Sequence, residues 1–137
     1  MEYLSRSVAE TESIAAKLAE SLQPNDLIAL EGELGAGKTQ FVRGLVKALG
    51  GDGRSVSSPT FVLLNVYQTP LFPVYHLDAY RIHGADDFAS IGFSELLEQN
   101  GIVVVEWPSR VQEILPPRRI DITFEITGKT TRKITLI

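Results

Sequence analysis

The chain has 137 residues, of which 44% are hydrophobic and 22% charged, and its formal net charge is −4. This composition is ordinary for one folded domain and excludes a disordered, collagen-like or coiled-coil chain, while the acidic balance argues against strong unaided binding to nucleic acid. The absence of cysteine excludes disulfides, thiolate metal sites and cysteine nucleophiles.

The first predicted elements are a helix, a buried strand and a second helix. Ser7–Glu10 form a capping box, after which apolar residues at helical spacing predict a helix to about Leu22. The unbroken apolar run Leu27–Leu30 is typical of a strand buried on both faces. Apolar residues then recur at intervals of three and four over Phe41–Leu49, and Gly50–Gly51 offer a left-handed stop for this second helix.

The middle of the chain predicts a hairpin, short helices and another buried strand. Phe61–Tyr67 and Leu71–Leu77 are strand-like and flank a short turn, which predicts the hairpin. Apolar residues among acids in Asp86–Asn100 suit one broken helix or two short ones. Ile102–Val105 predicts the second buried strand, and Ser109–Leu115 one or two further helical turns before a pair of prolines.

The last predicted element is a second hairpin. Ile120–Ile126 alternates apolar and polar residues, and Ile134–Ile137 returns after a Gly-Lys turn. Because no internal repeat or long linker divides the sequence, residues 1–137 predict a single compact α/β domain. The polar segment Met1–Thr11 and the shortness of every apolar run predict a cytoplasmic protein that does not enter a membrane.

A glycine-rich loop lies between the first buried strand and the second helix. Residues Gly32–Thr39 match the pattern G-x-x-x-x-G-K-[ST], in which glycine amides cradle phosphates. Lys38 can then reach the β- and γ-phosphates, and the Thr39 hydroxyl can coordinate Mg²⁺. The alternative is a glycine turn that merely connects two elements. We favour the first interpretation, which predicts ATP and Mg²⁺ as cofactors and a P-loop NTPase-like three-layer sandwich with a mainly parallel central sheet and antiparallel hairpins.

Two acids follow predicted strands and are candidates for the Mg²⁺ site and for catalysis. Asp78 follows Val74–Leu77, the end of a strand-like run, and Glu106 follows Ile102–Val105. In open parallel sheets, ligands bind beyond the carboxyl ends of the strands, so both acids face the phosphates if their strands are parallel to Leu27–Leu30. The alternative is that each acid is a solvated residue at the end of a strand.

Three short stretches accompany the glycine loop: Ser58–Phe61 (SPTF), His76–Arg81 (HLDAYR) and Glu106–Pro108 (EWP). Together the four motifs make the sequence similar to the TsaE family, bacterial ATPases that assist formation of threonylcarbamoyladenosine in tRNA. The resemblance covers nearly the whole chain. It implies an accessory protein that does not transfer the threonylcarbamoyl group itself, acts with the partners TsaD and TsaB, and meets tRNA only indirectly through that complex.

The resemblance also implies roles for individual residues. Thr39 and Glu106 resemble Mg²⁺ ligands, Asp78 a second catalytic acid beside Lys38, and Thr60 part of a switch loop. The implied nucleotide-binding residues are Thr11, Glu33, Leu34, Gly35, Ala36, Gly37, Lys38, Thr39, Thr60, Trp107 and Arg132. Thr11 and Arg132 belong to two segments, Ser7–Thr11 and Lys129–Arg132, that resemble an adenine-side rim. For Trp107 the alternative is a plain core residue, and His76 on its apolar strand is expected to be a core histidine.

The expected reaction is in-line attack of water on the γ-phosphate, with Asp78 or Glu106 orienting the water. We expect hydrolysis by the isolated chain to be slow, because an arginine supplied by a partner can raise the rate of such a reaction about 10³- to 10⁵-fold. Arg43, Arg81 and Arg110 are internal alternatives. The competing hypotheses are a small-molecule kinase, a GTPase and a non-enzymatic adaptor locked by its nucleotide. The GTPase is disfavoured because the sequence has no Asn-Lys-x-Asp run.

Overall fold

The computed structural model describes residues 1–59, 63–80 and 85–137. Its strands are β1 (Glu2–Ser5), β2 (Leu27–Glu31), β3 (Leu64–Tyr67), β4 (Val74–Asp78), β5 (Ile102–Glu106), β6 (Ile120–Ile126) and β7 (Arg132–Leu136). The α-helices are α1 (Val8–Ala19), α2 (Lys38–Ala48), α3 (Ala85–Ser90) and α4 (Phe93–Leu96), and two 3₁₀ helices are η1 (Gly53–Ser55) and η2 (Pro108–Ile114). Among these residues no helix is long and apolar enough to cross a membrane.

The strands of the described residues form one sheet in the order β1-β7-β6-β2-β5-β4-β3. The four central strands β6, β2, β5 and β4 are parallel to one another, whereas β3 pairs with β4, β7 with β6 and β1 with β7 in antiparallel fashion. This arrangement confirms the mainly parallel sheet and both antiparallel hairpins. Because β2, β4 and β5 run in the same direction, their carboxyl ends meet at one edge of the sheet.

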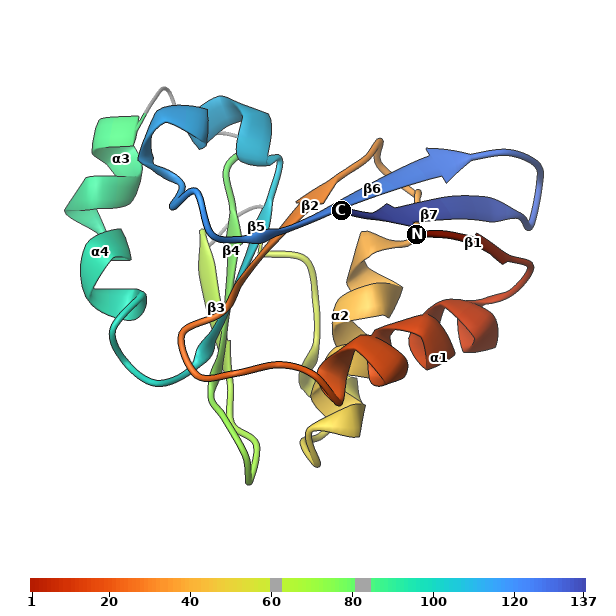
Figure 1. Ribbon diagram of the computed structural model, residues 1–137, viewed down its shortest axis with the longest axis horizontal. Helices are drawn as coiled ribbons and strands as arrows, with labels where there is room; N and C mark the ends of the chain where they lie inside the picture. Colours follow the sequence, from red (N-terminus) through yellow and green to blue (C-terminus); the bar gives the residue numbers. More distant parts are fainter. Residues whose placement is uncertain (60–62, 81–84) are drawn as a thin grey trace.

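Helices cover both faces of the sheet and make the predicted three layers (Figure 1). One core lies between the sheet and the pair α1 and α2, and includes Ile28, Phe41 and Val104. The other lies under α3, α4 and η2, and includes Leu27 and Val103. Neighbouring residues of β2 and β5 thus contribute to opposite cores, as expected of strands that are buried on both faces.

Helices α1 and α2 pack closely at a glycine. A Cβ atom added to Gly44 would lie 2.6 Å from both the Cα and the carbonyl oxygen of Glu12, so only glycine permits this approach. The start of α1 is fixed by the predicted cap: the Ser7 hydroxyl accepts from the Glu10 N–H at 3.1 Å. The Glu10 carboxylate in turn accepts from the Arg6 N–H at 3.0 Å. The cap thus fixes where α1 begins, and Gly44 sets how closely α1 and α2 approach each other.

The prediction missed one strand and placed some boundaries wrongly. Strand β1 was not predicted, because its four residues show no apolar run and gain their order by pairing with β7. Helix α1 ends at Ala19 rather than Leu22, since the next residues form tighter turns in which the Ser21 N–H bonds to the Leu18 carbonyl. Strand β4 begins at Val74 rather than Leu71, because the Thr69 side chain bonds the backbone N–H and carbonyl of Phe72 in a turn.

Other predicted elements are confirmed. The segment after residue 85 folds as two short helices, α3 and α4, and the run after β5 forms the 3₁₀ helix η2. Gly50 follows α2 with a φ of 93°, which is the left-handed stop that was predicted. The predicted strand Phe61–Tyr67 begins at Leu64 in the structure, and its first two residues lie outside the described ranges.

Candidate functional site

The glycine-rich loop joins the carboxyl end of β2 to the amino end of α2. Gly35 and Gly37 adopt φ angles of 81° and 104°, which side chains with a Cβ atom rarely tolerate. Gly32 is needed for a different reason, because a Cβ there would lie 2.9 Å from the Cβ of Phe124 on β6. Gly37 is the N-cap of α2 and supplies no side-chain cap. The first N–H groups of the helix are therefore available to an anion, which the helix dipole also attracts.

Lys38 is buried at the start of α2, with a side chain that is 5% exposed. Its Nζ donates to the Gly32 carbonyl oxygen at 2.6 Å, lies 3.7 Å from Oε1 of Glu106 and stands 4.0 Å from the centre of the Trp107 ring. Burial lowers the pKa of Lys38, and the negative charges of Glu106, Asp78 and Glu31 oppose that shift. The ammonium group is thus held between the glycine loop and the end of β5.

Asp78 and Glu106 lie side by side, as predicted for acids at the ends of parallel strands. They are register partners on β4 and β5, and both are almost fully buried. The ladder continues past them, since the Ala79 N–H donates to the Glu106 carbonyl oxygen at 3.0 Å. One oxygen of Asp78 accepts from the Tyr80 N–H at 2.8 Å. Burial at this edge of the sheet excludes the alternative that the two acids are solvated strand ends.

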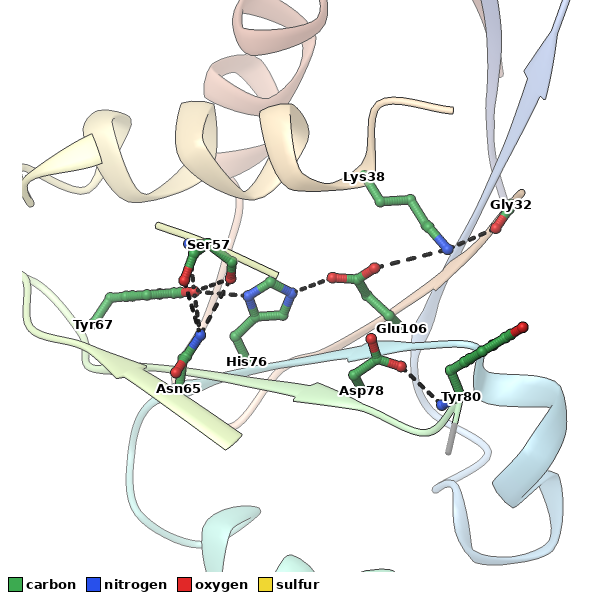
Figure 2. A network of polar contacts seen from close by, with 9 residues as sticks. All are labelled: Gly32, Lys38, Ser57, Asn65, Tyr67, His76, Asp78, Tyr80 and Glu106. Atoms are coloured by element: carbon green, nitrogen blue, oxygen red, sulfur yellow. Dashed lines mark hydrogen bonds and ion pairs between the residues drawn. The ribbon is translucent and has the colours of Figure 1, made fainter. Parts of the chain in front are cut away.

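A chain of polar contacts connects Glu106 with the interior of the sheet (Figure 2). His76 is fully buried, with Nε2 at 2.5 Å from Oε2 of Glu106 and Nδ1 at 2.9 Å from the Tyr67 hydroxyl. His76 is the buried, fully paired histidine that was expected, but the expectation did not include its partner. The sequence places His76 and Asp78 two residues apart on a strand and so on one face, but this spacing alone does not identify Glu106 as the partner of His76.

Trp107 follows Glu106 with a φ of 57°, so the chain turns sharply where β5 ends. Its indole is partly buried against the core under α3 and α4, yet it also faces the ammonium of Lys38 and lies 5.0 Å from the ring of Tyr80. The guanidinium carbon of Arg110 lies over the Tyr80 ring, 5.5 Å from its centre. Trp107 therefore forms part of the wall of the site as well as part of the core.

A cleft of about 350 Å³ lies next to the glycine loop. Its lining residues come from three parts of the chain: Arg6, Ser7, Val8 and Thr11; Gly35, Gly37 and Gln40; and Lys129, Thr130 and Arg132. The first and last of these segments are the predicted rim, and the fold brings them together. Arg132 joins them to the loop, since its guanidinium donates to the Gly35 carbonyl oxygen at 3.1 Å. The Thr11 hydroxyl pairs with the Ser5 hydroxyl at 2.7 Å, and Gln40 is a lining residue that the prediction missed.

The remaining predicted residues differ in their surroundings. Glu33 and Leu34 are exposed at the tip of the loop, Leu34 by 72%. Ala36 packs into the core below α2, and its N–H donates to the Glu33 carbonyl oxygen at 3.1 Å. Thr39 lies in the first turn of α2, next to Lys38. Thr60 lies outside the described residues, so its role in a switch loop stays a prediction.

Two of the three arginines considered as internal catalytic groups lie among the described residues, and of these Arg110 lies near the cluster of Trp107 and Tyr80. Arg43 instead donates to the carbonyl oxygens of Gly53 and Val56, both at 3.1 Å, and fixes the segment that follows α2. Arg81 lies outside the described residues.

The residues present fit a phosphate chain and a divalent cation. Exposed helix amides, left-handed glycines and a buried ammonium group form an anion site. Among the described residues no group of three or more His, Asp or Glu side chains forms a metal cluster. Mg²⁺ bound beside phosphates needs only one or two carboxylates, because phosphate and water oxygens complete its shell. Asp78, Glu106 and the Thr39 hydroxyl are suitable donors for such an ion.

A buried parallel strand, a loop with the phosphate-binding pattern and a helix that begins at its lysine define the class of P-loop α/β proteins. Within this class, residues 5–134 match the family described as threonylcarbamoyl adenosine biosynthesis protein TsaE. The chain belongs to the TsaE family.

Curated relatives named tRNA threonylcarbamoyladenosine biosynthesis protein TsaE agree with this assignment. The protein of Rickettsia felis is 38% identical over 93% of this chain and 74% of its own length, and that of Treponema pallidum is 37% identical over 99% of both. The crystal structure of Bacillus subtilis YdiB superposes with a TM-score of 0.81 at 31% identity, covering 99% of this chain and 83% of that one.

Proposed function

We propose that this protein binds and hydrolyses ATP with Mg²⁺ as an accessory factor in the formation of threonylcarbamoyladenosine in tRNA. Membership of the TsaE family, together with the names of the relatives, supports the pathway. One observation carries the ATPase part: Lys38 of the glycine loop, Asp78 and Glu106 converge at one edge of the sheet. A loop that only bound phosphate would not need two buried acids beside its lysine.

The chemistry follows from the position of each group. Lys38 and the first N–H groups of α2 stabilise the charge that spreads over the transferred phosphoryl group. The Thr39 hydroxyl and a carboxylate would hold Mg²⁺, which when bound would supply positive charge beside the phosphates. Asp78 and Glu106 share the tasks of holding this ion and orienting the attacking water. As the water oxygen bonds to the γ-phosphorus, the bond from phosphorus to the β–γ bridging oxygen breaks and ADP leaves, while the proton of the water is taken up at a carboxylate oxygen of this pair.

The cleft between Ser7–Thr11 and Lys129–Arg132 is the proposed place of the adenosine. It adjoins Gly35 and Gly37, so a base bound there would leave its phosphates directed along the loop. Its volume of about 350 Å³ is within the range of small-molecule sites. Trp107 and Leu34 would border the phosphates rather than the base, because both lie outside the residues that line the cleft.

The proposed partners are TsaD and TsaB, and the proposed location is the cytoplasm. A chain with a net charge of −4 has little means of holding tRNA alone, so it would reach tRNA only through these partners. Hydrolysis by the isolated chain should be slow. Arg43 is tied to the backbone carbonyls of Gly53 and Val56, which leaves Arg81, Arg110 or a partner to supply a catalytic arginine.

The test is depletion of the protein in its native cell, followed by mass spectrometry of nucleosides from bulk tRNA. We expect threonylcarbamoyladenosine to fall and to return when the wild-type gene, but not a Lys38→Met or Glu106→Gln variant, is restored. An unchanged level of threonylcarbamoyladenosine would refute the proposed role in this pathway. Rescue by Glu106→Gln without hydrolysis would instead favour the non-enzymatic adaptor, and phosphorylation of a small acceptor by the purified chain would favour the kinase.

A further inference from the structure

Glu106 is one of the least exposed acids of the described residues, and its two oxygens have different surroundings. Oε2 contacts Nε2 of His76 at 2.5 Å, whereas Oε1 faces Nζ of Lys38 at 3.7 Å. The short contact fixes one oxygen, so the plane of the carboxylate is set by the imidazole and the other oxygen is turned toward the glycine loop. We infer that His76 is a positioning residue that holds Glu106 in its working orientation.

The imidazole is itself held in place. His76 lies in the middle of β4, is fully buried and uses both ring nitrogens, so it has no freedom to turn. A neutral ring that donates from Nε2 to Glu106 must accept a hydrogen bond at Nδ1. The Tyr67 hydroxyl lies 2.9 Å from Nδ1 and can donate this bond when its hydrogen is directed to the ring. In that arrangement Tyr67 favours the tautomer in which His76 donates to the acid.

The Tyr67 hydroxyl is also tied to the segment that follows α2. It lies 2.9 Å from the Ser57 carbonyl oxygen and 3.3 Å from the Ser57 nitrogen, and Asn65 donates to the same carbonyl at 3.2 Å. Asn65 can therefore satisfy that carbonyl when the tyrosine hydrogen is directed to His76. The network links Glu106 on β5 to β4, β3 and residue 57 without passing through Lys38 (Figure 2).

This inference rests on the proposed ATPase activity, and its test separates the two. The variants are His76→Phe, which keeps a flat ring without a donor, His76→Gln, whose amide N–H can still donate to Glu106, and Tyr67→Phe. We expect His76→Phe to lower kcat for ATP about 10- to 100-fold, the usual effect of losing a group that orients a metal or catalytic ligand, with KM changed less than about threefold. His76→Gln should recover much of kcat, and Tyr67→Phe should lie between.

A matched control separates positioning from simple loss of stability. Val103 is fully buried on β5 but faces the opposite core, away from the network. Val103→Ala should lower Tm without changing kcat. If His76→Phe and His76→Gln lose activity equally, or if kcat follows Tm across all four variants, the role of His76 is structural and the inference is wrong. If His76→Phe does not fold, His76→Gln and Tyr67→Phe are compared instead. A higher kcat in His76→Gln supports the inference, and an equal loss of kcat in the two variants refutes it.

A second measurement does not depend on activity. Imidazole ¹⁵N and ¹H NMR of the wild type should show a slowly exchanging Nε2–H for His76 that shifts strongly in Glu106→Gln, and the spectrum of His76→Gln assigns the signal against that of the other histidine. An Nε2 signal indifferent to Glu106→Gln would overturn the inference. A wild type without ATP hydrolysis but with this shift would refute the proposed activity and leave the contact established. Hydrolysis by the wild type with an unchanged kcat in His76→Phe would support the proposed activity and refute the positioning role of His76.

Discussion

Replacing Lys38 by methionine tests the phosphate site most directly. Methionine keeps the length and the apolar stem of the buried lysine, so the change removes mainly the ammonium group. That group is already ordered, donating to Gly32 at 2.6 Å, and can turn to a phosphate without further ordering of the chain. Hydrogen bonds to charged groups contribute about 1.5 to 3 kcal/mol, so the affinity for Mg-ATP should fall roughly 10- to 160-fold.

The assay is thermal unfolding with and without Mg-ATP. At a concentration 100 times the wild-type Kd, a ligand stabilises the native state by about 2.7 kcal/mol, which for a domain of this size raises Tm by roughly 10 °C. At the same concentration the variant should gain only about 0.3 to 1.3 kcal/mol, or roughly 1 to 5 °C. Lys47→Met is the matched control, because Lys47 is exposed on the same helix and pairs with Glu12 at 2.9 Å. A Lys38→Met variant with the full wild-type shift would refute the assignment of the loop.

The other predictions concern the acid, the helix contact and the tryptophan. Glu106→Gln should keep the Mg-ATP stabilisation within a few degrees yet lose hydrolysis, and full turnover in a phosphate-release assay would move the catalytic role to Asp78. Gly44→Ala should lower Tm by up to roughly 7 °C, because overlap with the backbone of Glu12 costs roughly 1 to 3 kcal/mol and the helix preference of alanine offsets about 1 kcal/mol; a higher Tm would contradict the close contact. The fluorescence of Trp107, the only tryptophan, should change when Mg-ATP is added, since its ring faces the ammonium group that turns to the phosphates; no change at saturation would place it outside the site.

Local sequence patterns were sufficient for most of the central fold. Strands β2 and β5 are unbroken apolar runs, and the start of α1 is fixed by contacts within four residues, so each could be predicted from its own segment. Strand β1 could not, because Glu2–Ser5 is an edge strand whose order depends on β7, about 130 residues away. Edge strands lack the strong apolar pattern that marks a strand buried on both faces.

The sequence was a better guide to the identity of the site residues than to their arrangement. The glycine pattern identified Lys38, and the strand ends identified Asp78 and Glu106. The contact between His76 and Glu106 depends on the parallel register of β4 and β5, which no local signal fixes. The cleft beside Arg132 likewise needs the β6–β7 hairpin to meet α1, and the role of Arg43 in fixing the segment after α2 appears only in three dimensions.

The adjacency of Asp78 and Glu106 has a consequence for how the molecule folds. Each acid comes from a different strand, and the two meet only after β4 has paired with β5 and β5 with β2. Parallel pairings of this kind join distant segments and tend to form late in folding. A ligand that requires both acids would thus recognise only the fully assembled sheet, so it should slow unfolding while leaving the early events of refolding unaltered.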